Sequence, residues 1–335
     1  MMPGPVYRFH GMIEVSENSF ERRVETVVAP ESGGVRMDAY LSRRYTYLSR
    51  NAWQAEIKRG RIFLNESCMT NPHRTVRAGD RIRFSGMRVE EPPVDDRVGI
   101  LFEDQWLAVL DKSGNMPVHP AGRYFNNTLV RIMERKMGCA LLPVHRLDRE
   151  TSGVILFAKD SRTASAIQRN FSRVRKSYVA IVHGTMTPRR IEVDVPIGYD
   201  PSSEIKKMRL AYKDAPEAAF TDFKALFSFG DYTLVRAYPR TGRLHQIRVH
   251  LRYAGFPIVG DKMYGKDPAL YLRFIGEGMN ESLARELEMA RSALHSRSLS
   301  FYHPREKKMI YVKAPLPQDF REFILSRSQG ECRNR

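Results

Sequence analysis

Apolar and polar positions in residues 34–90 predict a small α/β module. After Arg36, apolar residues recur at helical spacing, which indicates one short helix. Ser49 is a suitable N-cap for a second helix, and Gly60 is a suitable stop for it. Short apolar runs bounded by turn residues predict strands in the rest of the module. The predicted strands are residues 62–64 and 81–84.

Three apolar patterns dominate the second part of the chain. The continuous apolar run of residues 154–158 predicts a strand that is buried on both faces. Residues 176–184 alternate, which predicts a strand with one apolar face. Residues 244–254 repeat at helical spacing, and Gly255 is a natural end for that helix. Since strands and helices do not alternate regularly, the patterns predict an α+β fold with a mixed, largely antiparallel sheet and flanking helices.

The same patterns divide the chain into five predicted segments. An acidic, Pro-rich stretch without periodicity separates the small module from a larger domain and is typical of a linker. Residues 267–293 look like a partly helical insertion in the larger domain, and the sequence assigns them no role. The predicted segments are an extension of uncertain order (1–33), the module (34–90), the linker (91–96), the larger domain (97–320) and a tail (321–335).

Basic residues exceed acidic ones. The chain carries 55 Lys and Arg against 38 Asp and Glu, a net charge of +17, and residues 34–90 alone carry twelve basic and five acidic residues. This excess favours a polyanionic partner, and nucleic acid fits it better than a membrane surface does. A solvated basic face is the alternative. The predicted phosphate contacts of the module are Arg43, Arg44, Arg50, Lys58, Arg59 and Arg61.

The cysteines and the hydropathy of the chain indicate whether it binds a metal and where in the cell it is expected. Cys68, Cys139 and Cys332 form no C-x-x-C pair and have no His at ligand spacing, so neither a zinc site nor a disulfide framework is predicted. No apolar run approaches the ~20 residues that span a bilayer. Five glutamates in residues 1–33 argue against a transit peptide. We therefore expect a cytoplasmic protein that binds no metal and no membrane.

The first chemically informative string is residues 145–153, His-Arg-Leu-Asp-Arg-Glu-Thr-Ser-Gly, directly before the buried strand. Asp148 lies in this short polar loop between two cations, Arg146 and Arg149. A single carboxylate on a rigid strand edge is suited to act as a nucleophile or a base. An Asp that caps a turn is the alternative.

The second string, residues 241–251, reads Thr-Gly-Arg-Leu-His-Gln-Ile-Arg-Val-His-Leu. His245, Arg248 and Arg252 fall on a face of the predicted helix away from the apolar one. One side of the helix should therefore pack on the core while the other offers a row of cations. A structural arginine, which caps a strand end or pairs with a surface acid, is the alternative.

Together, these strings and the strand at residues 176–184 resemble the RluA family, the large-subunit rRNA branch of the pseudouridine synthases. The strings HRLDxxTSG and TGRxHQIRVHL are too long to agree by chance, and the resemblance covers residues 100–315 or so. Residues 34–90 are similar to the small RNA-binding fold named after a small-subunit ribosomal protein and also found in tyrosyl-tRNA synthetases. One stretch departs from the family: residues 111–117 replace its usual Asn-Lys-Pro-Ala-Gly turn.

The resemblance implies a role for each matching residue. Asp148 matches the catalytic aspartate, Tyr178 the active-site tyrosine and Arg248 the active-site arginine, while Arg146 matches the arginine that fills the gap left by an extruded uridine. We expect Arg248 to keep Asp148 ionised. Tyr178 is expected to stack on the base and to help remove the carbon-5 proton. The other substrate contacts predicted in the larger domain are His145, Thr151, His245 and Arg243.

The family reaction isomerises uridine within RNA, and it implies no metal and no organic cofactor. The bond from ribose to the base nitrogen breaks, the uracil turns, and a bond from ribose to carbon 5 forms. Asp148 either attacks the anomeric carbon or removes a ribose proton to give a glycal, and the sequence leaves both routes open. The nucleotide has to be flipped into a pocket at a cost of roughly a few kcal/mol, which phosphate contacts offset.

Several alternatives stay open at this point. We expect a monomer that acts on a structured RNA, and the basic module favours large-subunit rRNA over tRNA. A tRNA pseudouridine synthase and a non-catalytic RNA-binding factor of ribosome assembly are alternatives. A hydrolase or other metal-free transferase that uses Asp148 is a third. A triad that contains Ser152 and a His is a rival arrangement, but no strained nucleophile elbow surrounds Ser152. Thr151 and Ser152 are therefore expected to fix the loop.

Overall fold

The computed structural model describes residues 12–16, 19–45, 48–205 and 207–332. Parts of the predicted extension and tail, residues 1–11, 17–18 and 333–335, lie outside this range, as does the side chain of Cys332. Contacts divide the chain into two compact units. The small unit comprises Met1–Val94 and His119–Ile132, and the large unit comprises Asp95–Val118 and Met133–Arg335.

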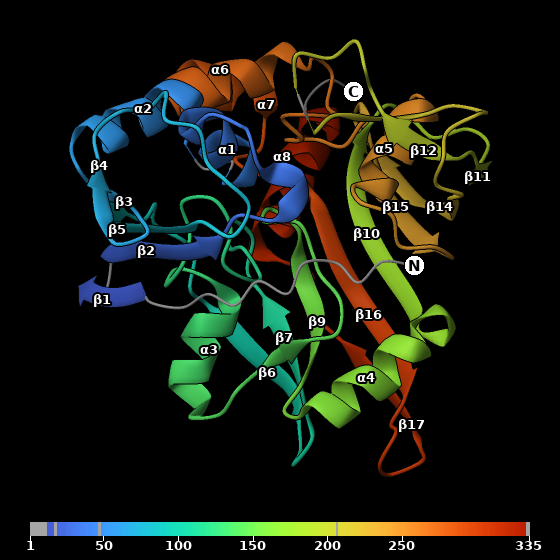
Figure 1. The fold of residues 1–335 in the computed structure, drawn as a ribbon. Coiled ribbons are helices and arrows are strands. Elements are labelled where there is room, and N and C mark those ends of the chain that lie inside the picture. Colours follow the sequence, from blue (N-terminus) through green and yellow to red (C-terminus); the bar gives the residue numbers. More distant parts are fainter. Residues whose placement is uncertain (1–11, 17–18, 46–47, 206, 333–335) are drawn as a thin grey trace. The chain divides into compact units, whose positions relative to one another are not determined.

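The small unit is an antiparallel sheet with two helices. The strand order is β1-β2-β5-β3-β4, and the elements pack around a core that includes the fully buried Trp53 (Figure 1). Their bounds are β1 Met12–Ser16, β2 Ser19–Val27, the 3-10 turn η1 Pro30–Ser32, α1 Met37–Arg44, α2 Arg50–Lys58, β3 Ile62–Leu64, β4 Ser67–Met69 and β5 Arg81–Glu90.

Both predicted helices and both predicted strands of this unit are confirmed. Ser49 caps α2, because its side chain accepts a hydrogen bond from Ala52 N at 3.2 Å. Strand β2, for which the sequence predicted no element, pairs with β5. Glu91, in the predicted linker, is buried and accepts hydrogen bonds from the backbone of Phe125, Asn126 and Asn127 at 2.8 Å each.

The large unit is built on one mixed sheet, which confirms the predicted α+β class. Its strand order is β11-β14-β15-β10-β16-β9-β7-β6, with β17 on β16 and β8 on β9 (Figure 1). Among the pairings of the described residues, only β16 with β9 is parallel. The strands are β6 Val98–Glu103, β7 Leu107–Lys112, β8 Leu142–Pro143, β9 Ser152–Ala158, β10 Arg175–His183, β11 Arg190–Asp194, β12 Ile197–Tyr199, β13 Arg209–Ala211, β14 Phe220–Phe229, β15 Tyr232–Pro239, β16 Leu294–Tyr302 and β17 Met309–Lys313.

Helices flank this sheet, and the small β12–β13 pair lies apart from it. Every residue of β9 is buried, as its apolar run predicted. Val154 and Leu156 of β9 share one core cluster with Ala164 and Ile167 of α4. The helices are α3 Leu129–Met137, which crosses the boundary between the units, α4 Ser161–Arg169, the 3-10 turn η2 Phe171–Arg173, α5 Gln246–Tyr253, α6 Ala269–Glu277, α7 Glu281–Leu287 and α8 Gln318–Cys332.

Gly153, the second residue of β9, allows this strand to pair closely with β16. Its φ is +101°, a conformation that L side chains rarely adopt, and it pairs with Ser296 of β16 in the parallel part of the sheet. A Cβ at this position would lie 2.2 Å from the Ser296 carbonyl oxygen. Glycine therefore lets two backbones approach directly beside the loop that carries Asp148.

We expect Gly153→Ala to destabilise the protein by about 3 kcal/mol or more, because backbone strain adds to a clash with backbone atoms. The matched control is Gly138→Ala, since Gly138 has φ +66° but open space around its Cβ position. That control should cost only about 1–2 kcal/mol. Urea unfolding followed by circular dichroism measures both, and equal losses would show that the close approach is unimportant.

Candidate active site

The polar loop of residues 145–151 leads into β9 and holds Asp148 at its edge. Thr151 N donates to the Asp148 backbone carbonyl at 3.1 Å, which closes a backbone turn over residues 148–151. The fully buried Lys112 donates through Nζ to the Arg149 carbonyl at 3.0 Å and also to the carbonyls of Ser113 and Met116. Residues 111–117, which depart from the family pattern, therefore still hold this loop in place, because all three donors of the buried Lys112 ammonium are satisfied.

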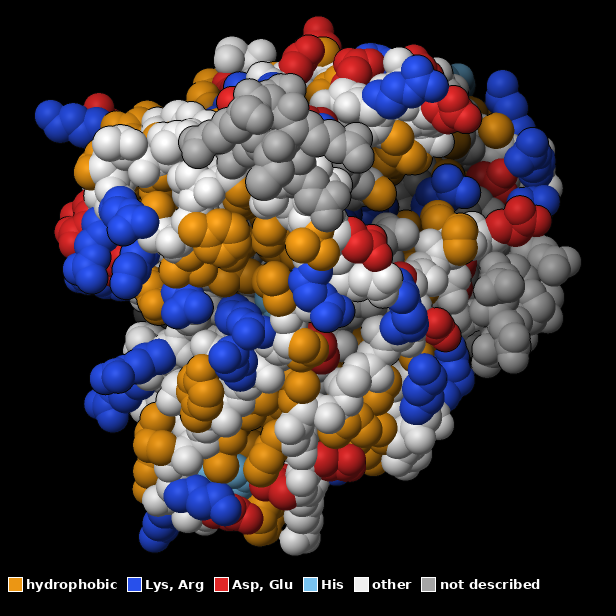
Figure 2. All heavy atoms as spheres, turned by 180° about the vertical axis from the view of Figure 1, so that it is seen from behind, with side chains coloured by type: hydrophobic (Ala, Val, Ile, Leu, Met, Phe, Trp, Pro, Cys, Tyr) orange, Lys and Arg blue, Asp and Glu red, His pale blue; other side chains and the backbone are white. Residues whose placement is uncertain are grey.

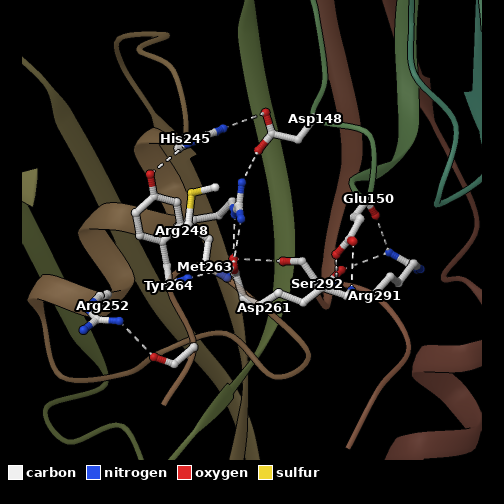
Figure 3. Close-up of polar contacts among 12 residues, drawn as sticks. Asp148, Glu150, His245, Arg248, Arg252, Asp261, Met263, Tyr264, Arg291 and Ser292 are labelled. Atoms are coloured by element: carbon white, nitrogen blue, oxygen red, sulfur yellow. Dashed lines mark hydrogen bonds and ion pairs between the residues drawn. The ribbon is translucent and has the colours of Figure 1, made fainter. Parts of the chain in front are cut away.

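Helix α5 brings Arg248 to this loop. Ile247 and Leu251 are buried, and Gly255 ends the helix at φ +84°, as predicted. The prediction that His245 lies within the helix is wrong, because His245 is the N-cap residue with a left-handed φ of 60°. From this position before the first turn of α5, the imidazole points toward Asp148 (Figure 3).

The centre of the site is an ion triad. Arg248 Nη1 donates to Asp148 Oδ2 at 2.9 Å, while Nε and Nη2 form a two-point contact with the buried Asp261 at 2.5 and 2.8 Å (Figure 3). The side chain of Asp148 remains 22% exposed, whereas that of Asp261 is fully buried. The guanidinium is therefore fixed by one carboxylate and presented to the other, and such a planar fork has no lysine equivalent.

This arrangement keeps both carboxylates ionised. Burial alone would raise the pKa of Asp148, but the charge and the hydrogen bond of Arg248, together with the nearby His245, hold that pKa below its usual value. Burial would also raise the pKa of Asp261, but the charge and hydrogen bonds of Arg248 lower that pKa to about 2. Met263 N and Tyr264 N also donate to Asp261, at 3.0 and 2.9 Å. Asp148 is thus an anion at neutral pH.

His245 is oriented beside the triad as a neutral group. Its Nδ1 lies 2.8 Å from Tyr264 Oη, and its Nε2 lies 3.9 Å from Asp148 Oδ1. Burial lowers the pKa of His245 to about 4, although Asp148 acts in the opposite direction. The imidazole therefore carries no charge between pH 5 and pH 8, the range in which an unperturbed histidine titrates.

We expect the single-turnover rate constant at saturating enzyme to stay constant between about pH 5 and pH 7. The lowered pKa values leave Asp148 ionised and His245 neutral across this window, and the rate should fall only as the pH drops toward about 4, where His245 protonates, and below it, where Asp148 does. Quenched-flow measurement over a pH series tests this. An acid limb with a midpoint near 6.5 that disappears in His245→Gln would contradict it.

Tyr178 comes to the site from β10, and the residue is only 9% exposed. It lines a cavity of about 430 Å³ together with Asp148 and Arg248. Burial raises the pKa of Tyr178 to about 12, and the negative charge of Asp148 adds to the effect. Because the phenol stays protonated at neutral pH, its flat ring is better suited to stacking than its oxygen is to proton removal.

The other predicted substrate contacts of the large unit also line this cavity. Arg146 and Arg243 are exposed at it, and Thr151 is buried in its wall. His145 lines it too, but its Nε2 accepts a hydrogen bond from Leu156 N at 3.0 Å and so also ties the loop to β9. The fold therefore places the residues that were predicted from the two sequence motifs around one cavity.

The six predicted cations of the small unit differ in their surroundings. Arg50 pairs with Asp38 at 3.1 Å, and Arg59 and Arg61 pair with Glu56 at 2.5 and 2.9 Å. Arg43, Arg44 and Lys58 are exposed. On the face shown in Figure 2, Lys and Arg side chains gather at several places.

The structure also contains the serine–histidine pair that a hydrolase would need, but in the wrong setting. Ser152 Oγ lies 3.0 Å from His295 Nδ1. Both side chains are almost fully buried, and among the described residues no carboxylate is bonded to His295. Burial lowers the pKa of His295 to about 3, so it is a poor base at neutral pH. Ser152 fixes the start of β9 instead.

Asp261 is the member of the site that sequence reasoning missed. It follows Gly260 in a short turn, and only its acidic character next to a strand end marked it. In the described part of the chain, no group of three or more His, Cys, Asp or Glu side chains could hold a metal ion. The described helices include none that is long and apolar enough to cross a membrane.

Comparison with known proteins shows which family this chain resembles. Residues 106–253 match a family described as RNA pseudouridylate synthase. The chain is 30% identical over 334 residues to ribosomal large subunit pseudouridine synthase D of Xanthomonas campestris pv. campestris, with 96% of this chain and 98% of the relative covered. It is 35% identical to an uncharacterised RNA pseudouridine synthase of Chloroflexus aurantiacus, at 96% and 98% coverage.

Solved structures are similar as well. The human protein RNA pseudouridylate synthase domain containing 4 superposes with a TM-score of 0.53 at 30% identity, and covers 69% of this chain and 93% of its own. Human RNA pseudouridylate synthase domain containing 1 gives a TM-score of 0.54 at 25% identity, with 67% and 86% covered. Both likenesses are to proteins of one enzyme family.

Proposed function

This chain belongs to the family of RNA pseudouridine synthases, which isomerise uridine to pseudouridine in RNA, and from that premise we propose that Asp148 is its catalytic carboxylate and large-subunit ribosomal RNA its substrate. One observation carries the assignment of Asp148. Its carboxylate is ionised and partly exposed, and lies 2.9 Å from Arg248 beside the cavity that Tyr178 lines.

The reaction requires an anion at Asp148 by either route. The carboxylate forms a bond to the anomeric carbon as the glycosidic bond to N1 breaks, or it takes the proton from ribose carbon 2 to leave a glycal and free uracil anion. The uracil then turns, carbon 5 bonds to the anomeric carbon, and Asp148 is released or returns the proton. Carbon 5 loses its proton and N1 gains one, so the product is an isomer.

Arg248 and Tyr178 have supporting roles in this proposal. Arg248 positions Asp148 and keeps it ionised, as its contact with Asp261 fixes the guanidinium. Tyr178 stacks on the flipped uracil and limits its movement while the glycosidic bond is broken. Arg146, exposed at the cavity, fills the place of the extruded base in the RNA.

The choice of ribosomal RNA rests on relatives and on charge. Ribosomal large subunit pseudouridine synthase D of Xanthomonas campestris and that of Pseudomonas aeruginosa are similar to most of this chain. Residues 34–90 act as an RNA-binding module whose exposed Arg43, Arg44 and Lys58 contact phosphates, which fixes position without reading sequence. We propose a monomeric cytoplasmic enzyme with residues 97–320 as the catalytic domain.

The test is pseudouridine formation by the purified protein in transcribed large-subunit ribosomal RNA and, separately, in a pool of transcribed tRNAs. Chemical labelling of pseudouridine followed by primer extension maps the modified positions. We expect modification of the ribosomal RNA alone. Modification of tRNA alone would overturn the substrate, and binding without modification in either RNA would favour an assembly factor.

A further inference from the structure

Asp148 also lines a second cavity. It measures about 250 Å³, several times the ~30 Å³ that one water occupies in the liquid. Five residues line both this cavity and the one with Tyr178: Arg146, Asp148, Thr151, His245 and Arg248. A strand of RNA that delivers a uridine to Asp148 therefore meets two adjoining spaces, one of which the target base occupies in the proposed reaction.

Helix α6 forms the outer wall of this second cavity. Tyr271, Phe274 and Ile275 of α6 line it, and Met263 adds a further apolar side chain. The three α6 residues fall in the insertion of residues 267–293, to which the sequence assigned no role. The wall is therefore an aromatic and aliphatic surface within the catalytic site of a charged enzyme, and such a surface favours an apolar or π-faced occupant.

Cations surround this apolar wall. Arg149 and Lys262 line the cavity, and their charged groups lie 5.8 and 5.2 Å from the centre of the Phe274 ring. Lys262 Nζ is held by Glu150 at 2.8 Å, so its position is fixed. Aromatic planes interleaved with cations are the combination with which proteins bind unpaired nucleotides, because every base has a π face and a nearby phosphate.

The wall is built as a stable hairpin. Leu270 of α6 packs with Leu283 and Leu287 of α7 in a small core of its own, and Phe274 packs against this core. Arg273 pairs with Glu286 across the hairpin at 2.8 Å. Ile275 is 64% exposed at the mouth of the cavity, which makes it accessible to a ligand without disturbing the hairpin.

We infer that this cavity is a subsite for the base of an unpaired RNA nucleotide next to the target uridine, which stacks on the α6 wall. The inference rests on the proposed function and extends it to substrate binding. A neighbour base held there keeps the strand open at the flipped uridine, so the subsite contributes to RNA binding rather than to bond breaking. Stacking tolerates any base, so the subsite recognises an open RNA strand rather than a sequence.

The test compares three variants on the transcribed large-subunit ribosomal RNA that the wild type modifies. Ile275→Asp places a charge at the mouth of the cavity, and Phe274→Leu removes the ring without adding charge. Leu272→Asp is the matched control, because Leu272 is exposed on the same helix (42%) but does not line the cavity. We expect the first two to raise KM about 5- to 100-fold, with the single-turnover rate at saturation unchanged, and the control to stay within about twofold.

A second arm identifies the occupant. Once the modified uridine is mapped, synthetic stem-loops carry an abasic residue at each neighbouring position in turn. At one position the abasic substitution should raise KM for the wild type and leave Phe274→Leu unaffected. Equal KM values for Ile275→Asp and Leu272→Asp would overturn the subsite. So would abasic substitutions that raise KM by the same factor in Phe274→Leu as in the wild type at every position. A wild type that modifies no RNA would instead refute the proposed function, and the subsite with it.

Discussion

Asp148→Asn is expected to fold and bind RNA like the wild type and to form no measurable pseudouridine. The amide keeps the size of the carboxylate but can neither bond to the anomeric carbon nor take a ribose proton, so kcat should fall by at least about 10⁴-fold. The fold should survive, because Arg248 keeps its two-point contact with the buried Asp261. Single-turnover pseudouridine formation and filter binding measure the two properties separately.

The control for this variant is Asp214→Asn, which removes the same charge from an exposed loop position of the large unit. It should leave both turnover and binding within about twofold of the wild type, since exposed charges contribute little. Turnover of Asp148→Asn within tenfold of the wild type would rule out Asp148 as the catalytic carboxylate. Loss of RNA binding together with turnover would instead point to a binding role.

Arg248→Met carries the second large effect, on stability as well as on activity. Removal of the guanidinium leaves Asp261 buried without its counter-ion, which typically costs about 3–5 kcal/mol. Asp148 also loses the charge that lowers its pKa, so activity should fall by at least about 10²-fold. Urea unfolding and single-turnover kinetics on the same preparation measure both losses.

Pairing this change with Asp261→Asn separates the two effects. The neutral amide needs no counter-ion and can still accept hydrogen bonds from Met263 N and Tyr264 N. The double variant should regain most of the lost stability but remain inactive, because Asp148 still lacks its partner. Activity that returns together with stability would mean that Arg248 supports only the fold, and the account of the ion triad would be wrong.

Local patterns were sufficient for the secondary structure around the site. The unbroken apolar run of β9 could be satisfied only by burial on both faces, and the repeat in α5 marked its core side. Residues 145–151 were informative because a short loop that leads directly into a buried strand has little conformational freedom. These inferences held because each depends on residues within a few positions of one another.

Patterns failed where the determining contact is distant in the chain. His245 was expected inside α5, but its contacts with Tyr264 and Asp148 favour a left-handed N-cap that no helical repeat can reveal. Asp261 was missed because its role depends on a contact with Arg248. The two residues are thirteen positions apart, and no helical or strand spacing predicts that contact. Strand β2 was missed for the same reason, because its partner β5 is far along the chain.

The sequence by itself determined the strands and helices that carry the site, the basic character of the chain and, through two long strings, the family to which it belongs. Only the tertiary structure decided that Arg248 bridges two carboxylates, that Tyr178 is protonated beside Asp148, and that α6 walls a second cavity. The reason is physical: helices and strands depend on near neighbours, whereas pKa values and cavities depend on burial and charge contributed by segments that are distant in sequence.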